Sequence, residues 1–152
     1  PLAQRTVLDA APGGGSFARV DIGPADYDAF TEILTEVQKA WSGGDMTPAA
    51  YLLSDEVRDH LTAQLAEDKA AGRRNHVSDV VLVKGDLDQA WREDGLDWAT
   101  VSMRWRALDY TVDVASGRVI DGNDRMPVEA SERWTLSRRS GDSWRLVAIE
   151  QM

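Results

Sequence analysis

The chain has 152 residues, of which 43% are hydrophobic and 28% charged, fractions typical of a single globular domain with a substantial core. Its formal net charge of −9 at pH 7 disfavours sequence-independent binding to nucleic acids, although arginine pairs at 73–74 and 138–139 are local exceptions. The absence of cysteine excludes a disulfide framework, a thiolate nucleophile and an iron–sulfur site. No apolar run approaches the ~18–20 residues that span a bilayer.

The first 23 residues show little periodicity and contain the glycine-rich run 11–16, which is typical of a flexible linker. We interpret residues 1–23 as an N-terminal arm, with residues 17–22 expected to lie against the body, and residues 24–152 as one domain. Because the chain opens with Pro1 instead of methionine, we expect a fragment or a processed form from which an N-terminal targeting or anchoring segment has been lost.

Three helices are predicted in the first half of the domain. The first begins after Gly23-Pro24 and ends at Gly43-Gly44. Thr47 is the predicted N-cap of a short second helix, and Ser54 is that of a third helix ending near Gly72. The first helix has one broad apolar stripe, with residues at spacings of three and four: Tyr27, Phe30, Ile33, Leu34, Val37 and Trp41.

Strand patterns replace helical ones from Asn75 onward. A β region over residues 77–91 is predicted to bulge near Gly85-Asp86, and Asp94-Gly95 is a hairpin signal. The longest predicted strand follows over residues 99–112, and its apolar face is predicted to swap halfway, from the row that starts at Ala99 to the row that starts at Leu108. A short edge strand at 119–120 and a loop over 121–127 complete this part.

The C-terminal hairpin, residues 128–151, is the clearest strand pattern in the chain. Its first strand alternates apolar and polar residues, except that Glu132 falls on the apolar face between Ala130 and Trp134. Its second strand is apolar on both faces from Leu146 to Ile149, which predicts a position in the middle of the sheet. Helices first and strands after predict an α+β fold, with three N-terminal helices packed on a curved antiparallel sheet of about four strands.

Motifs for cofactor chemistry are lacking. The two histidines, His60 and His76, have no partner at metal-ligand spacing, and the Gly13–Gly15 run lacks the lysine of a phosphate-binding loop. We therefore expect no metal, no cofactor and no dedicated catalytic residue.

Glu132 is the polar residue whose placement requires a reason. It could be a general acid or base with a raised pKa in an apolar pocket. The structural alternative is an ion pair with an arginine such as Arg104 or Arg145, or a hydrogen bond to a tryptophan or tyrosine, and we favour the ion pair because burying a lone carboxylate costs several kcal/mol. The aspartates around Tyr110, Asp109 and Asp113, could likewise form an acid–base set, although turn chemistry with a packed ring is the commoner reason for an Asp-Tyr pair at a strand end.

The concave side of the sheet is the predicted location of a pocket or interaction site. Core packing is the default role for the tryptophans, with ligand stacking as the alternative, and Trp91 and Trp98 are a predicted cross-strand pair. The candidate pocket or interaction residues are Trp41, Met103, Trp105, Tyr110, Glu132 and Trp134.

A set of short patterns over residues 26–151 resembles one known family. In order these are Trp41-x-Gly-Gly-Asp45, Leu52-Leu53-Ser54, Asn75-x-Val77-x-Asp79-Val80, Asp109-Tyr110, Glu132-x-Trp134-Thr135 and Trp144-x-Leu146-x-Ala148-Ile149-x-Gln151. Together they resemble the C-terminal domain of the mitochondrial inner-membrane import translocase subunit forty-four in its bacterial version, the Tim44-like domain.

The resemblance implies the cystatin-like cone shared with nuclear transport factor two and a non-enzymatic role in a protein tethered to a bacterial inner membrane through an N-terminal segment. The implied partners are other proteins, chiefly membrane or envelope proteins, with a lipid or apolar small molecule in the cone as a further option. Two alternatives remain open: a small isomerase- or dehydratase-like enzyme that uses Glu132, Asp109 or Tyr110 in an open cavity of at least ~300 Å³, and an apolar-ligand binder without chemistry.

Overall fold

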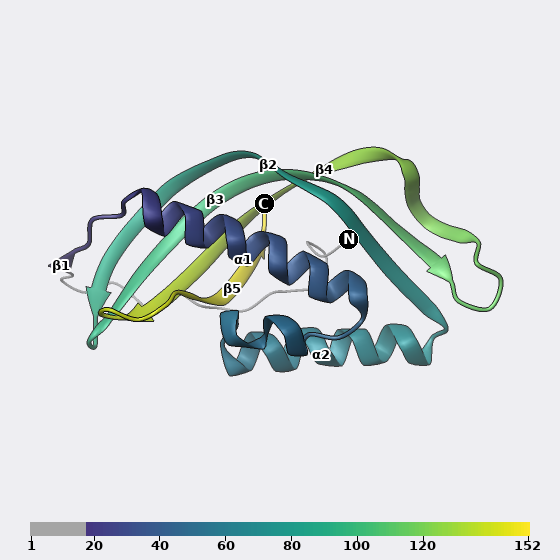
Figure 1. Ribbon diagram of the computed structural model, residues 1–152, viewed down its shortest axis with the longest axis horizontal. Helices are drawn as coiled ribbons and strands as arrows, with labels where there is room; N and C mark the ends of the chain where they lie inside the picture. The colour runs from purple at the N-terminus through teal and green to yellow at the C-terminus, as the bar shows by residue number, and fades with distance from the viewer. Residues whose placement is uncertain (1–17) are drawn as a thin grey trace.

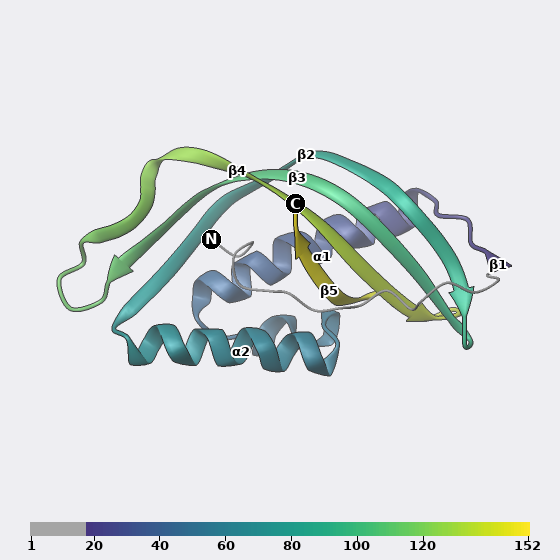
Figure 2. The same cartoon turned by 180° about the vertical axis from the view of Figure 1, so that it is seen from behind.

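A computed structural model describes residues 18–152 of the protein. Two α-helices and one short 3₁₀ helix lie on the concave side of an antiparallel sheet that arches over them (Figure 1, Figure 2). The strand order is β1-β2-β3-β4-β5, so each strand pairs with its neighbours in the sequence. The predicted α+β fold is confirmed.

Helix α1 (Pro24–Gly43) lies across the concave face of the sheet (Figure 1). The carboxylate of Asp26 accepts a hydrogen bond from the Gly23 backbone N–H at 2.9 Å. It thereby provides a partner for a backbone donor at the start of the helix. Gly44 ends the helix in the left-handed conformation, with φ of 79°. The predicted apolar stripe is buried from Phe30 to Trp41, whereas Tyr27 remains 40% exposed.

The predicted short helix is a 3₁₀ helix, η2 (Thr47–Leu52), and Thr47 is not its N-cap. Instead the Thr47 backbone N–H donates to the carboxylate of Asp45 at 2.9 Å. Helix α2 (Asp55–Ala70) is capped as predicted, because Ser54 Oγ accepts a hydrogen bond from the Val57 backbone N–H.

The long hairpin of β2 (Arg73–Glu93) and β3 (Leu96–Asp113) forms the centre of the sheet. Asp94 and Gly95 both have positive φ, 53° and 74°, as expected for a two-residue hairpin turn. The bulge predicted near Gly85-Asp86 is displaced by about two residues: these two residues pair regularly with β3, and the register shifts on either side of them, between Leu82 and Lys84 and between Leu87 and Gln89. A further shift lies between Ser78 and Val81. Extra residues at these places increase the bend of the strand.

The apolar face of β3 does not swap, contrary to the prediction. The inward row that begins at Ala99 continues through Asp109 and Thr111, which are 4% and 8% exposed. Leu108 and Tyr110 lie half-buried on the other face. The inward row thus becomes polar at its far end, where its polar side chains meet Asn75 of β2.

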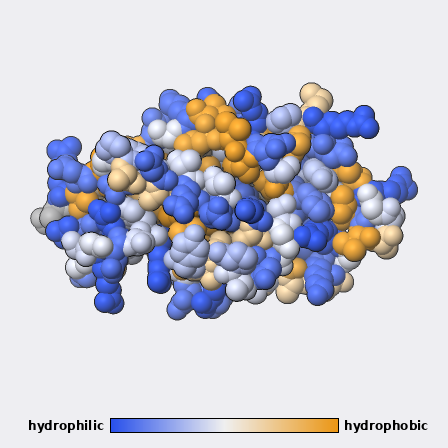
Figure 3. Space-filling view, viewed as in Figure 1, coloured by the Kyte–Doolittle hydropathy of each residue, from blue (hydrophilic) through white to orange (hydrophobic). Residues whose placement is uncertain are grey.

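Strand β4 (Val119–Arg139) includes the predicted short edge strand and the predicted loop over 121–127, and it exceeds β3 in length. Asp109 pairs with Asn123 and Ala107 with Val128, so residues 124–127 form an irregularity within the ladder. This end of the sheet extends beyond the helices (Figure 1). Hydrophobic surface is visible there and over β2 (Figure 3).

Strand β5 (Arg145–Gln151) lies at the edge of the sheet, so its predicted central position is wrong. It is nevertheless buried, because the connection from η2 to α2 covers its outer side: Leu53 forms an isolated parallel bridge with Leu146, and the Ser54 N–H donates to the Leu146 carbonyl at 2.9 Å. A register shift at Val147 turns both Leu146 and Ile149 toward the core.

The N-terminal arm is described only from residue 18. Strand β1 (Ala18–Arg19) pairs with Arg92 and Trp91 at the end of β2, and Ile22 packs against the core; Phe17 and the glycine-rich run lie outside the described residues. Within residues 18–152, neither α-helix combines the length and the apolar character needed to cross a bilayer.

Candidate functional site

Large side chains fill the interior of the cone. Trp41, Trp105 and Trp134 are at most 1% exposed, and Met103 is 5% exposed. A hollow of about 240 Å³ remains between α1 and the sheet, and of the predicted site residues only Met103 borders it. Its other lining residues are mostly apolar: Tyr27, Phe30, Thr31, Leu34, Leu82, Gly85 and Val101.

Glu132 is fully buried in this interior and forms no ion pair with any residue of the described range. The predicted ion pair is therefore wrong, since Arg104 approaches Glu129 instead at 3.6 Å. The alternative of a hydrogen bond to a tryptophan is confirmed: Trp105 Nε1 donates to Glu132 Oε1 at 2.5 Å. The second oxygen, Oε2, has no hydrogen-bond partner among residues 18–152.

Burial raises the pKa of Glu132 to about 7, because a carboxylate loses its hydration in this environment. The indole groups of Trp105 and Trp134 oppose the rise, and the negative charge of Asp109 adds to it. The Glu132 carboxyl group therefore ionises near neutral pH in the folded protein. This behaviour by itself does not identify a catalyst, because the Glu132 side chain is 0% exposed and does not line the hollow beneath α1.

A second polar cluster, which the sequence reasoning missed, lies at the far end of β3. Trp41 Nε1 donates to Asn75 Oδ1 at 3.0 Å, and Asn75 Nδ2 donates to Asp109 Oδ1 at 2.7 Å and to Thr111 Oγ1 at 3.2 Å. The side chain of Asn75 thus joins α1 to β3. The available signal was its position at the first residue of a strand pattern, where a buried asparagine requires partners.

Tyr110, the remaining predicted site residue, lies on the opposite face of β3 from Asp109. Its ring stacks on His76 with centroids 5.3 Å apart. Burial and the neighbouring charge of Arg74 lower the pKa of His76. Glu132, Asp109 and Tyr110 therefore do not converge on one open cavity.

Asp26 anchors the start of α1 to the end of the sheet. Its Oδ1 accepts hydrogen bonds from Arg138 Nη1 at 2.8 Å and from Trp144 Nε1 at 2.9 Å. The Arg138 guanidinium also stacks over the Trp144 ring, 4.3 Å from the centroid, and donates to the buried Asp97. Burial raises the pKa of Asp26, but the hydrogen bonds from Gly23 and Trp144 and the charge of Arg138 outweigh that effect and leave the pKa lowered.

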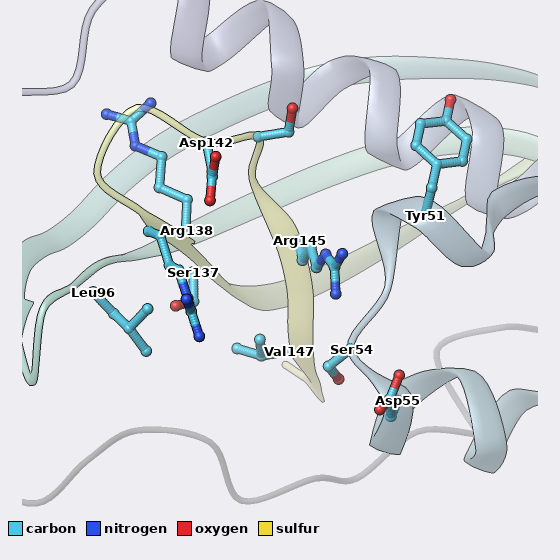
Figure 4. A pocket seen from close by; sticks show the side chains of 11 residues that line it. Tyr51, Ser54, Asp55, Leu96, Ser137, Arg138, Asp142, Arg145 and Val147 are labelled. Carbon is cyan, nitrogen blue, oxygen red and sulfur yellow. The ribbon is translucent and has the colours of Figure 1, made fainter.

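A hollow of about 820 Å³ forms a groove at the edge of the sheet (Figure 4). We call it the β5 groove. Leu96 pairs with Arg139 and Ser137 pairs with Arg145, so these side chains lie on the same, outward face of β3, β4 and β5. The other wall comes from η2 and α2. The groove is lined by Tyr51, Ser54, Asp55, Leu96, Ser137, Arg138, Arg139, Asp142, Ser143, Arg145 and Val147.

The fold and these features define a small α+β domain in which helices close the concave face of an antiparallel sheet. Within that class, the sequence model of the Tim44-like domain matches residues 21–151. The chain belongs to the Tim44-like domain family, as the short patterns predicted.

Comparison with solved structures supports the cone fold. The intermembrane space region of the chloroplast protein ARC6 superposes with a TM-score of 0.53 at 13% identity, covering 89% of this chain and 98% of that chain. Aln2 from a Streptomyces species gives a TM-score of 0.48 at 15% identity, covering 86% of this chain and 93% of that chain. No curated protein matches the sequence. At these identities the ARC6 likeness concerns the fold alone.

Proposed function

We propose that this Tim44-like domain is a non-catalytic protein-binding domain. The observation that carries the proposal is the filled cone: three fully buried tryptophans occupy the interior, together with Asn75 and Glu132, which accept hydrogen bonds from Trp41 and Trp105. Recognition is thereby assigned to the outer surface, where the β5 groove is a hollow of about 820 Å³. An acid–base mechanism would require Glu132, Asp109 and Tyr110 to face one open cavity, and Tyr110 faces away.

Site-specific photo-crosslinking in cells tests this function. A photoreactive residue replaces Tyr51, which is 58% exposed in the groove, and in a control it replaces Met126, which is 66% exposed at the far end of β4. We expect a reproducible protein adduct from position 51. Protein adducts from neither position would refute the proposal.

We further propose that the domain is tethered to a bacterial inner membrane. Family membership supports it, and residues 1–23 would then serve as an arm leading into a domain formed by residues 24–152. The expected partners are membrane or envelope proteins. Fractionation of the full gene product provides the test: recovery in the membrane fraction, resistant to salt washing, is expected, and release into the soluble fraction would contradict the tether.

Binding of an apolar ligand is a second candidate function, favoured by the hollow of about 240 Å³ beneath α1. Its volume lies below the ~300 Å³ of common small-molecule sites, which suits one short acyl chain or a similar group. Native mass spectrometry of the purified protein tests this candidate. A bound mass that disappears in Val101→Phe, which narrows the hollow, would support it, and an unliganded mass in the parent protein would oppose it.

A further inference from the structure

We propose that the β5 groove binds an acidic, extended peptide segment of a partner protein, with Arg139 and Arg145 pairing with its carboxylates. This inference rests on the proposed protein-binding function and adds the chemistry of the partner. It begins from the distribution of charge. In a chain with a net charge of −9, three arginines line this one groove.

The three arginines differ in whether their guanidinium groups already pair with a carboxylate of this chain. Arg138 is engaged by Asp26 and Asp97 at 2.8 and 3.1 Å. Arg139 and Arg145 are exposed and form no ion pair with any residue between 19 and 152. Two guanidinium groups therefore stand ready for an incoming anion, and carboxylates bind such groups in a bidentate manner.

The pairing of the strands fixes how these two guanidinium groups are presented. Arg139 lies opposite Leu96, and Arg145 lies opposite Ser137, in adjacent positions of the same sheet face. Leu96 and Ser137 thus lie beside the two basic side chains on this face. Val147 and the exposed ring of Tyr51 extend the apolar part of the lining. In an extended peptide that alternates acidic and apolar residues, all the acidic side chains lie on one face, so two of them can meet Arg139 and Arg145 together.

The carboxylates at the groove favour a narrow peptide over an anionic membrane. Asp55 and Asp142 also line the groove, and Asp55 is partly neutralised by Arg58 at 3.4 Å. A flat anionic bilayer would meet these carboxylates and the overall charge of −9 together, which disfavours its approach. A single peptide strand can place its carboxylates at Arg139 and Arg145 without bringing a layer of negative charge against the rest of the surface.

Fluorescence anisotropy with labelled synthetic peptides tests the inference on the full chain. The probe is a short peptide in which glutamate alternates with valine, and the comparison peptides carry glutamine or lysine in place of glutamate. We expect binding of the glutamate peptide alone, weakened by added salt. The double variant Arg139→Glu/Arg145→Glu is expected to bind at least ~10-fold more weakly, because two attractive charge pairs become repulsive.

The matched control is Arg106→Glu/Arg118→Glu, which makes the same change in net charge at two exposed arginines outside the groove. Its affinity should stay close to that of the parent protein. The neutral variant Arg139→Gln/Arg145→Gln should be intermediate, and circular dichroism verifies that all variants fold. An equal loss in the groove and control variants would overturn the proposal, as would absence of binding to the glutamate peptide.

Vesicles of phosphatidylcholine and phosphatidylglycerol in equal amounts provide a further outcome. Groove-dependent binding to these vesicles without binding to the peptide would overturn the peptide in favour of a lipid phosphate.

The crosslink at position 51 distinguishes failure of the acidic-peptide chemistry from failure of the protein-binding function. A protein adduct that persists in Arg139→Glu/Arg145→Glu would refute the acidic-peptide chemistry and leave the protein-binding function standing, whereas no adduct in the parent protein would refute the function itself.

Discussion

Replacement of Glu132 by glutamine should change the pH dependence of stability in a defined direction. The pKa of this carboxyl group is raised from 4.5 to about 7 in the folded protein. One pKa unit corresponds to ~1.4 kcal/mol, so the shift corresponds to about 3 kcal/mol in the free energy of unfolding. Glutamine is neutral at every pH and retains an oxygen that accepts the hydrogen bond from Trp105.

The sign follows from the raised pKa. Below pH 4.5 the carboxyl group is protonated in both the folded and the unfolded chain, so its ionisation costs nothing. As the pH rises through 4.5 the unfolded chain releases the proton while the folded chain retains it, and stability falls until the pH reaches about 7. Relative to Glu132→Gln, the parent protein should therefore lose about 3 kcal/mol of stability over this window and lose no more above it.

Urea denaturation followed by far-ultraviolet circular dichroism, repeated across this pH range, measures the effect. The matched control is Glu129→Gln, which changes an exposed carboxylate three residues earlier on the same strand. A difference between the parent protein and Glu132→Gln that is independent of pH, or that favours the parent as the pH rises, would refute the buried-carboxyl reasoning.

Three further changes test the packing around the site. Asn75→Ala should lower the free energy of unfolding by about 1–3 kcal/mol, because its buried partners lose their hydrogen bonds; Ser78→Ala, outside this network, is the control for the denaturation measurement. Gly122→Ala should cost about 3 kcal/mol, because its φ is 75° and a Cβ there would lie 2.3 Å from the Asp109 carbonyl oxygen, whereas Gly117→Ala, with a φ of 73° and open surroundings, should cost about 1 kcal/mol. Equal melting temperatures for the two glycine variants would contradict the steric argument. The parent protein should lose stability as the pH falls through the lowered pKa of Asp26, and Asp26→Asn should lack this contribution at every pH. The acid unfolding curves of the parent and the variant should therefore converge at low pH.

Local patterns identified most of the elements because they depend on neighbouring residues. The helix start at Gly23-Pro24, the Ser54 cap and the Asp94-Gly95 turn each satisfy backbone groups within a few residues. Spacing of apolar residues likewise located the inward rows of α1 and β3. These features are visible in the sequence since both partners of each interaction are close in the chain.

The incorrect predictions concern interactions between distant residues. The apolar second strand of the hairpin suggested a central position, but the chain from η2 to α2 covers the edge strand β5 through Leu53 and Ser54. The predicted face swap in β3 failed because Asn75, 34 residues before Asp109, supplies the hydrogen bonds that allow polar side chains to remain inside. Periodicity reports which face is apolar, and it contains no information about a polar partner on another strand.

The predicted site residues likewise divide into those that local patterns identify and those whose roles depend on contacts between distant residues. Sequence reasoning selected the tryptophans and Glu132, which proved to be packed together in the interior, and it treated the Arg138-Arg139 pair as a minor exception to an acidic surface. Only the fold separates the two members of that pair: alternation along β4 directs Arg138 toward Asp26 and Asp97, and directs Arg139 to the opposite face beside Arg145.

Mutations can therefore distinguish the polar groups that hold the fold together from the exposed arginines of the β5 groove. Substitutions of the buried Asn75 and Glu132 and of the partly buried Asp26 act on hydrogen bonds that hold α1 and the strands together, so their effect on binding should follow their effect on stability. Substitutions of Arg139 and Arg145 alter exposed charges without a partner among the described residues, and surface changes of this kind usually alter stability by less than about 0.5 kcal/mol. A loss of binding without a loss of stability is therefore the result that assigns recognition to the β5 groove.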